Sequence, residues 1–371
     1  MKKILHIPNY YPPHTGGIEY TCHQIVSNLP DFVHEVICFN DKKDSAADYY
    51  EGVKVIRCGI FKKIAGQALS LVYFRSLRRE MKLFQPDIVH FHAPNPLISL
   101  YLLMLLPRHV KLVVHFHAEI LTSKLLYCLY KPFEMVLLKR ADRILTTTPK
   151  FKDEVKLLAP YKQKCTVIES IISTSELEVS AKDRDEIIRI QKKFGNKKIV
   201  LSFGRHVYYK GLEYLIKAEP FIAEDCVILI GGTGPLTEQL KKMTDSARIH
   251  FIGRIPDEEL KYYLHAAYLF AFPSITKAEA FGLTLAQCMY CYTPPITFTI
   301  PESGVNYVSL ADITGLEVEN KNFIGFAKAV DTLLANEDLQ KTFAVAGHQR
   351  VVDNFIMAKI KSKLSVLYNQ L

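Results

Sequence analysis

Short, almost continuously apolar segments alternate with segments of helical periodicity along nearly the whole chain. Strands that are apolar along their whole length and alternate with helices are typical of parallel sheets covered by helices on both faces. The expected strands of the first half are 4–7, 34–39, 53–57, 88–91, 112–116, 143–147 and 166–169, and those of the second half are 199–203, 227–231, 249–252, 268–273 and 293–297. The pattern therefore predicts an α/β fold of doubly wound parallel sheets.

The strand pattern is interrupted once, near the middle of the chain. A chain of 371 residues with 49% hydrophobic content is long enough for two or three domains with large cores. The interruption contains a charged run at 182–186, and the pattern restarts at Lys198. We therefore expect an N-terminal domain over 1–175, a linker over 176–196 and a C-terminal domain over 197–356. Ligands of such domains bind at the carboxyl ends of the strands, so a cleft between the two sheets is expected.

The eight cysteines are scattered along the sequence, and only Cys288 and Cys291 have a C-x-x-C spacing. No βαβ redox context precedes this pair, so we interpret it as helical packing. Scattered cysteines in apolar segments indicate reduced core residues of a cytosolic protein.

Two apolar runs could be mistaken for targeting or membrane segments. The run after the basic N-terminus is far shorter than a signal peptide needs, and we interpret it as the first buried strand. The longest run, 97–106, has ten residues, whereas a membrane-spanning helix needs about 20. We expect a buried helix there and a protein that is not integral to a membrane.

The net charge of +9 is concentrated in the N-terminal half, where residues 1–180 hold 24 Lys and Arg against 17 Asp and Glu. No zinc-finger, helix-turn-helix or RNP-like pattern accompanies the charge, so we expect no nucleic-acid partner. Between 61 and 84, basic and apolar residues alternate as in a helix that lies on an anionic membrane surface. The alternative is a core-facing helix with a solvated basic side.

Glu279 stands in a polar loop between an expected strand and a helix that begins near Gly282. The start of a helix offers free backbone N–H groups and the positive end of a dipole, which together attract an anion. The acid before it can meet the uncharged, hydroxyl-rich part of the same ligand. This arrangement suits a nucleotide-sugar; the alternative is that Glu279 only caps a surface helix and Gly282 serves packing.

Arg205 and Lys210 follow the expected strand 199–203, next to Gly211. Arginine can grip phosphate oxygens with its planar fork and lysine supplies a mobile point charge, so the pair suits a diphosphate. A solvated basic loop is the alternative. Two further glycines, Gly16 and Gly17, join the first strand to a helix, where they permit either close approach to a ligand or a plain turn.

Two histidine pairs, His90-x-His92 and His115-x-His117, end the fourth and fifth expected strands. The spacing of two puts both members of each pair on one face of a strand, so a metal site must be considered. No carboxylate or cysteine completes a ligand set at a familiar spacing, so we expect no metal and leave hydrogen-bonded structural histidines as an alternative.

Together these segments resemble the family-4 retaining glycosyltransferases. The acid segment is similar to the family's E-x7-E signature, with Glu279 as the first acid and Gln287, a departure, at the second position. In the family the second acid binds the nucleotide ribose, and glutamine keeps an acceptor but loses the charge. The basic loop resembles the G-R-x4-K-G segment, which implies that Arg205 and Lys210 bind the donor diphosphate.

The resemblance implies further donor contacts. It assigns Gly16 and Gly17 to the donor phosphate and sugar, Gly234 to a loop on the nucleotide side, and Arg254 and Ile255 to the segment that meets the nucleobase. The helix start at Gly282, Leu283 and Thr284 would bind phosphate. The resemblance also places His117 beside the transferred sugar, and Glu119 stands where the family often has an acid. The segment 300–307 is similar to one common in bacterial polysaccharide and lipid-linked glycan enzymes.

The resemblance implies the GT-B architecture, two Rossmann-like domains facing a central cleft, with a C-terminal helix at about 357–371 packed back on the N-terminal domain. The implied reaction moves a sugar, with retention, from a nucleoside-diphosphate sugar to a hydroxyl of a glycan or lipid-linked glycan. Its implied catalytic residues are Glu279, His117, Arg205 and Lys210. No cofactor and no metal are expected.

Two other functions stay open at this point. A nucleotide-sugar epimerase can share the fold, and Gln287 leaves room for a non-catalytic nucleotide-sugar-binding protein. The expected location is the cytoplasm or the inner face of the plasma membrane, with an anionic membrane surface as a further partner.

Overall fold

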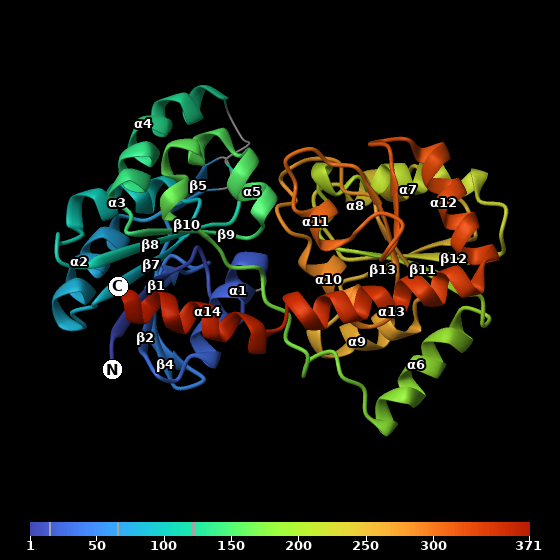
Figure 1. Cartoon of the computed structure of the whole chain (residues 1–371), viewed down its shortest axis with the longest axis horizontal. Coiled ribbons are helices and arrows are strands. Elements are labelled where there is room, and N and C mark those ends of the chain that lie inside the picture. Colours follow the sequence, from blue (N-terminus) through green and yellow to red (C-terminus); the bar gives the residue numbers. More distant parts are fainter. Residues whose placement is uncertain (15, 65–66, 120–123) are drawn as a thin grey trace. The chain divides into compact units, whose positions relative to one another are not determined.

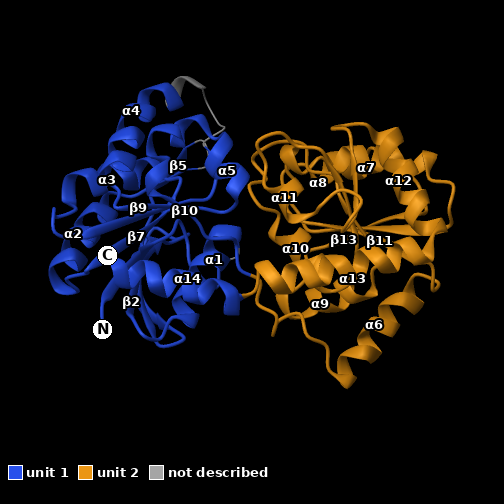
Figure 2. Cartoon of the chain, in the orientation of Figure 1, with its two compact units in different colours: residues 1–171, 357–371 blue, residues 172–356 orange. Residues whose placement is uncertain are grey.

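The computed structural model describes residues 1–371 except 15, 65–66 and 120–123. The chain divides into two compact units, which Figure 2 colours separately. Unit 1 comprises Met1–Ile171 and Met357–Leu371, and unit 2 comprises Ile172–Ile356.

Unit 1 is built on an eight-stranded sheet with the order β10-β9-β8-β7-β1-β2-β4-β3. Its strands are β1 (Lys3–Ile7), β2 (Val33–Phe39), β3 (Ala46–Tyr50), β4 (Val53–Cys58), β7 (Ile88–Ala93), β8 (Lys111–Phe116), β9 (Arg143–Thr146) and β10 (Cys165–Val167). All neighbours are parallel except β3 and β4. The strand order reverses its direction at β1 and β7, so the loops after these two strands flank the place where ligands bind in doubly wound folds.

Helices cover both faces of this sheet (Figure 1). They are α1 (Gly17–Asn28), α2 (Leu71–Leu83), α3 (Pro96–Leu105), α4 (Lys124–Arg140), α5 (Pro149–Glu154) and α14 (Met357–Gln370), with a 3-10 segment at Lys156–Lys164. Local sequence explains the starts of two of them. The side chains of Ser70 and Asn95 accept hydrogen bonds from the backbone N–H groups of Tyr73 and Ile98, which caps α2 and α3.

The C-terminal helix α14 packs on unit 1. Its Ile360, Leu364, Leu367 and Tyr368 are buried together with Ile4, Ile88, Val113 and Leu145, which lie on one face of four neighbouring strands. This face is apolar near the amino ends of the strands and becomes rich in histidine towards their carboxyl ends.

Unit 2 contains a six-stranded parallel sheet with the order β13-β12-β11-β14-β15-β16. Its strands are β11 (Lys198–Phe203), β12 (Cys226–Gly231), β13 (Ile249–Gly253), β14 (Leu269–Phe272), β15 (Pro295–Phe298) and β16 (Leu316–Val318). The order reverses between β11 and β14, as in the Rossmann fold. The helices are α6 (Ala181–Lys193), α7 (Leu212–Ala218), α8 (Thr237–Lys241), α9 (Asp257–Ala266), α10 (Leu283–Tyr290), α11 (Val305–Val308), α12 (Phe323–Ala335) and α13 (Glu337–Asn354), with 3-10 turns at Tyr208–Lys210 and Glu219–Phe221.

The predicted fold class is confirmed, and each predicted strand is present with bounds that differ by at most two residues. The pattern did not reveal β3, the short hairpin β5 (Lys62–Ile64) and β6 (Gln67–Leu69), or β16. These elements are exposed or lie at a sheet edge, where the alternation of buried residues is weak.

Several expectations about single segments are wrong. The linker expected over 176–196 contains α6, which begins at a capping box of Ser180 and Asp183 and belongs to unit 2. The run 97–106 forms a helix, but this helix is only half-buried, and Met104 is 72% exposed. All eight cysteines are free, and Cys128 is exposed, whereas the others are buried.

The segment 61–84 is also not one helix, because its first part forms the β5–β6 hairpin. Only α2 is helical, and its apolar residues Tyr73, Leu77 and Met81 face the core. Over the part of the chain that the structure describes, no helix combines the length and the apolarity needed to cross a membrane.

Candidate functional site

In unit 2, the loops that follow the strands β11, β12 and β13 are hydrogen-bonded to one another at the carboxyl edge of the sheet. The N–H of His206 donates to the carbonyl of Thr233 (3.1 Å), and the N–H of Gly232 donates to the carbonyl of Gly253 (2.7 Å). A Cβ atom at Gly234 would lie 2.4 Å from the carbonyl oxygen of His206, so only glycine permits this approach. The loops containing Arg205, Gly234 and Arg254 therefore form one connected surface.

Lys210 and Glu279 form an ion pair across the point where the strand order reverses. The Nζ atom of Lys210 lies 2.5 Å from Oε2 of Glu279, and the side chains are 13% and 11% exposed. Burial alone would lower the pKa of Lys210, but the charge of Glu279 outweighs it, so the pKa is raised and the ammonium stays charged. The loop after β11 and the loop after β14 thus bring opposite charges together at the carboxyl edge of the sheet.

Gly211 explains how these two loops come so close. Its φ of +59° lies in the left-handed region, and a Cβ atom there would lie 2.1 Å from the carbonyl oxygen of Pro273. The N–H of Ile275 donates to the carbonyl of Tyr209 at 2.9 Å, which joins the loops directly. The glycine after Lys210 is therefore required by contact with the neighbouring loop.

The loop of Glu279 is braced by serines that the sequence analysis did not single out. The hydroxyl of Ser274 donates to Oε2 of Glu279 at 3.1 Å, and the hydroxyl of Ser303 donates to the backbone carbonyl of Glu279. The N–H of Gly304 donates to the carbonyl of Ala280 at 3.1 Å. The segment 300–307, noted only for its family resemblance, thus holds the acid in position; a buried serine beside a functional loop gives no periodic signal in sequence.

The helix α10 starts immediately after this acid. Gly282 caps it with φ +85°, and no side chain accepts a hydrogen bond from its first turn. The hydroxyl of Thr284 is buried and has no hydrogen-bond partner among the described residues. Gln287 follows Leu283 by four residues, so it lies on the same side of the helix, and it is 7% exposed. The helix start therefore offers unused donors beside the Lys210–Glu279 pair.

Two arginines complete the polar edge of unit 2. Arg205 and Arg254 are exposed, and neither side chain has an ion-pair or hydrogen-bond partner in the part of the chain that the structure describes. Ile255 is buried, and its side chain packs closely against Gly231: a Cβ atom at Gly231 would lie only 2.9 Å from Cδ1 of Ile255. Its side chain is thus part of the core, and only its backbone is available to a ligand.

In unit 1, Gly16 and Gly17 begin α1 as predicted, in extended and helical backbone, respectively. A Cβ atom at Gly16 would lie 2.2 Å from Oε2 of Glu19, so the carboxylate of Glu19 folds back over the helix start. Burial raises the pKa of Glu19, although backbone hydrogen bonds and the charge of His14 oppose the shift. Phosphate at this helix start would have to displace the Glu19 carboxylate.

His117 follows β8 and is 7% exposed. Its Nε2 lies 3.0 Å from Nδ1 of His92, and its ring stacks on that of His115 at 3.9 Å. Burial lowers the pKa of His117 from its ordinary 6.5 to about 3. Whatever it contacts, His117 therefore acts as a neutral imidazole at physiological pH.

The other histidines of the two pairs are only partly hydrogen-bonded. Nδ1 of His90 lies 2.5 Å from the hydroxyl of Tyr368, but Nε2 of His90, Nε2 of His92 and both nitrogens of His115 are buried and have no partner among the described residues. The described protein groups therefore use only part of the hydrogen-bonding capacity of His90, His92 and His115. Glu119, whose role the resemblance left open, lies near the residues 120–123, which are outside the described part.

Family models match two consecutive parts of the chain. The model for glycosyltransferase family 4 matches residues 15–176, and the model for group 1 glycosyl transferases matches residues 183–350. The matches therefore account for most of both units.

Similar proteins agree with these matches. D-rhamnosyltransferase WbpZ of Pseudomonas aeruginosa is 28% identical over 88% of this chain and 85% of its own length. O-antigen chain mannosyltransferase C of Escherichia coli is 25% identical over 95% of this chain and 94% of its own. The solved structure of Anabaena Alr3699/HepE in complex with UDP has a TM-score of 0.79 at 16% identity and covers both chains completely.

The fold is that of the GT-B glycosyltransferases, with two Rossmann-like units. The chain belongs to glycosyltransferase family 4, as the sequence motifs predicted, and it is a glycosyltransferase.

Proposed function

We propose that the protein transfers a sugar, with retention of configuration, from a nucleoside-diphosphate sugar to a hydroxyl of a glycan or lipid-linked glycan. The observation that carries this proposal is the Lys210–Glu279 pair, 2.5 Å apart, beside the open start of α10. A cation and a row of free N–H groups suit a diphosphate, and a carboxylate suits sugar hydroxyls. The relatives named as rhamnosyl- and mannosyltransferases, and the UDP in the HepE complex, support the same class of donor.

In the proposed reaction, the bond between the anomeric carbon and the diphosphate oxygen breaks, and its electron pair stays on the diphosphate. Lys210, Arg205 and the N–H groups of Gly282–Thr284 stabilise the charge that develops there. The acceptor oxygen bonds to the anomeric carbon from the same face, and its proton passes to the departing diphosphate. Glu279 holds the sugar hydroxyls. The resemblance to family 4 assigns the neutral His117 to the transferred sugar.

We propose that no metal ion takes part in this step. Arg205 and Arg254 are exposed and unpaired among the described residues, and Lys210 is charged, so the chain itself supplies the cations that a diphosphate needs. Transfer in the presence of a chelator at an undiminished rate is the expected outcome, and a requirement for Mg²⁺ or Mn²⁺ would contradict it.

The acceptor side of the proposal includes an anionic membrane surface. Arg75, Arg78, Arg79 and Lys82 are exposed on α2, which buries only its Tyr73, Leu77, Glu80 and Met81 side chains. The helix α3 packs against both α2 and α4, and Figure 1 shows the three helices along one side of unit 1. On α4, Leu129, Phe133 and Val136 are exposed by 67, 47 and 54% at helical spacing. Cations next to exposed apolar side chains suit a peripheral enzyme at the inner face of the plasma membrane.

The deciding experiment combines donor binding and product analysis. A thermal-shift screen against UDP, GDP and their sugars should identify the donor, because a ligand that binds only the folded state stabilises it. With that donor and a glycan acceptor, the anomeric configuration of the product, determined by NMR, should equal that of the donor. Inversion would contradict the retaining mechanism. A changed sugar without acceptor would indicate an epimerase, and binding without transfer or hydrolysis would indicate a non-catalytic protein.

A further inference from the structure

A row of buried histidines lies on one face of the unit 1 sheet, under α1 and α14. His6 pairs with His90 across β1 and β7, and His92 pairs with His115 across β7 and β8. All four are fully buried. Because paired residues of neighbouring strands point to the same face, the four imidazoles gather in one layer inside the protein.

The hydrogen bonds of this layer determine which nitrogen of His6 carries a proton. Nε2 of His34 contacts the carbonyl oxygen of Leu29 at 2.9 Å, so this nitrogen must donate. Burial keeps His34 neutral by lowering its pKa, so Nδ1 of His34 accepts, and it lies 3.0 Å from Nε2 of His6, which donates. Burial also lowers the pKa of His6, so its Nδ1 holds a bare lone pair.

This lone pair on Nδ1 of His6 has no partner among the described residues, and other nitrogens of the layer also lack one. Nε2 of His90, Nε2 of His92 and both nitrogens of His115 are also buried and unpartnered. Native structures leave few buried polar atoms without a partner, so five such atoms in one layer call for a ligand. Neutral imidazole nitrogens are the commonest protein ligands of transition metals.

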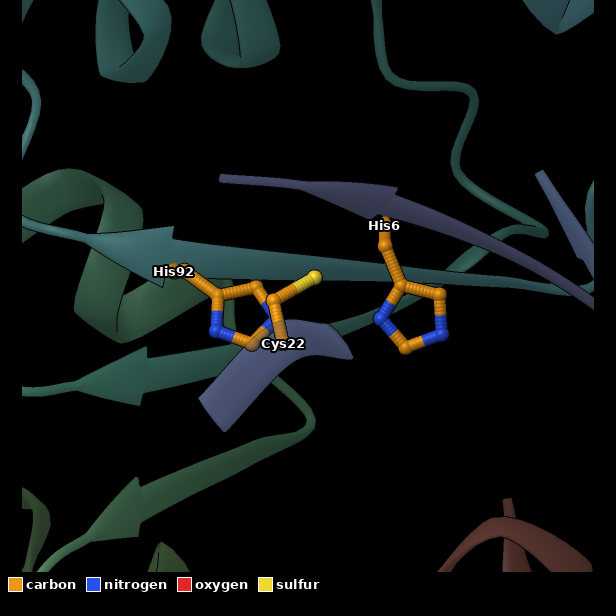
Figure 3. A group of neighbouring side chains, drawn as sticks. All are labelled: His6, Cys22 and His92. Atoms are coloured by element: carbon orange, nitrogen blue, oxygen red, sulfur yellow. The ribbon is translucent and has the colours of Figure 1, made fainter. Parts of the chain in front are cut away.

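A cysteine on the covering helix completes the set. Figure 3 shows the sulfur of Cys22, from α1, directed between the rings of His6 and His92. The ligand atoms of Cys22, His6 and His92 lie within 4.8 Å of one another, and so do those of His90, His92 and His115. The two groups share His92, so His90 and His115 are candidate further donors for a metal held by the first.

We propose that unit 1 binds one zinc ion through Cys22, His6 and His92, with His90 or His115 as the fourth ligand. Zinc prefers a tetrahedral set of nitrogen and sulfur ligands at about 2.0–2.3 Å from the ion, so ligand atoms that already lie within 4.8 Å of one another have to approach only a little further. On binding, the thiol of Cys22 releases its proton to solvent as the zinc–sulfur bond forms.

The neighbouring hydrogen bonds suit such a site. A histidine that binds zinc usually donates its other N–H to a partner, which fixes its ring. His6 donates from Nε2 to His34, and Nδ1 of His92 lies 3.0 Å from Nε2 of His117. The ion would therefore join α1 to β1 and β7, while the proposed transfer chemistry uses the cations of unit 2. The inference stands on these contacts and does not rest on the proposed function.

The whole 371-residue chain, produced in zinc-supplemented medium, should contain about one zinc per chain by elemental mass spectrometry after extensive buffer exchange. Replacement of zinc by Co²⁺ should give the intense thiolate-to-cobalt absorption and the visible bands of a tetrahedral site. A chelator should lower the Tm of the zinc-loaded protein.

The variant Cys22→Ala should lose the thiolate band and bind zinc at least tenfold more weakly, and the chelator should no longer change its Tm. Cys58→Ala is the matched control, because Cys58 is an equally buried thiol of the same unit on β4; its metal content and spectrum should equal those of the wild type. Wild-type protein without zinc and without a cobalt spectrum would overturn the proposal, and so would a cobalt spectrum that persists unchanged in Cys22→Ala. The wild-type measurements decide even if a variant fails to fold.

Discussion

Lys210 and Glu279 are 69 positions apart in the sequence, yet their charged atoms lie 2.5 Å apart at the reversal of strand order in unit 2. The pair is nearly buried, so each charge depends on the other. If a donor diphosphate binds Lys210 and its sugar binds Glu279, two contacts to substrate replace the one ion pair between these residues.

Lys210→Ala should therefore affect both binding and stability. Loss of a charge-assisted bond should weaken nucleoside-diphosphate binding by about 1.5–3 kcal/mol, measured by calorimetry. The Tm should also fall, because the Glu279 carboxylate is left buried without its partner, and Lys210→Ala combined with Glu279→Gln should recover part of this loss. Lys261→Ala is the control, because Lys261 and Asp183 form a comparably buried ion pair, 3.0 Å apart, that is not part of the site. A comparable loss of nucleotide affinity in Lys261→Ala would contradict the assignment.

Gly211→Ala should be more damaging than an ordinary glycine substitution. Its Cβ atom would meet the carbonyl of Pro273 at 2.1 Å, whereas Gly195, with a similar φ of +68°, has open space around it. Gly195→Ala should cost only the left-handed backbone strain, about 1–2 kcal/mol. Gly211→Ala should cost at least about 1–3 kcal/mol more by denaturant unfolding, because the loop must shift. Equal losses in the two variants would show that the close approach of the loops is unimportant.

Arg205 should contribute to binding without contributing to stability. Its side chain is exposed and has no ion-pair partner among the described residues, so Arg205→Ala should leave the Tm within about 1 °C while it weakens nucleoside-diphosphate binding by about 1.5–3 kcal/mol. Arg184, an exposed arginine of α6, serves as the control. Unchanged nucleotide affinity in Arg205→Ala would remove Arg205 from the donor site.

The sequence predicted the fold because buried parallel strands carry their signal locally. Each apolar run between two helices is visible without knowledge of its neighbours, whereas β3 and β16 depend on pairing at a sheet edge and gave no such signal. The same reason applies to α6: its charged residues resemble a linker, but its Ile190 packs in the core of unit 2.

The candidate site was predictable only where a motif is contiguous. Arg205, Lys210 and Glu279 stand in recognisable segments, but the serines that hold Glu279 come from loops with no pattern of their own. The group of His6, Cys22 and His92 shows the limit most clearly. Its members come from β1, α1 and β7, so no sequence spacing connects them.

The buried histidines should make the metal-free protein sensitive to acid. The pKa values of His90 and His117 fall from 6.5 to about 3 in the folded state because of burial. Between these values the unfolded chain binds protons that the folded chain does not, so stability falls as the pH drops below 6.5. Each of the two should remove about 1.4 kcal/mol from the free energy of unfolding between neutral pH and pH 5.5.

Urea unfolding in chelator at both pH values measures this loss. His90→Gln should reduce the pH dependence, and His109→Gln, at an exposed position, should leave it unchanged. A free energy of unfolding that is constant between pH 7.5 and 5.5 would contradict the buried, neutral state of these rings.

Gln287 tests whether the departure from the family signature preserves ribose binding. It lies on the side of α10 that carries Leu283 and is 7% exposed. Gln287→Glu should retain or improve donor binding, because the carboxylate is a stronger acceptor, whereas Gln287→Leu should weaken it by about 1 kcal/mol, the net value of one hydrogen bond. Donor titrations of the two variants decide; if leucine has no effect, the ribose contact does not exist.

Vesicle sedimentation tests the proposed membrane surface. Binding should require anionic lipid and should fall with added salt, because screening shortens the range of charge attraction. Arg75, Arg78 and Arg79 changed together to Gln should weaken binding by about 1 kcal/mol for each charge removed near the surface. Leu129→Ser with Phe133→Ser should weaken it further by removing the apolar contact of α4. The matched control is Ile188→Ser with Val345→Ser, two exposed apolar residues of unit 2 at 45 and 61% exposure, which should bind like the wild type. Equal recovery with neutral and anionic vesicles, or none with either, would leave α2 and α4 as ordinary solvated helices and the excess positive charge of unit 1 to another partner.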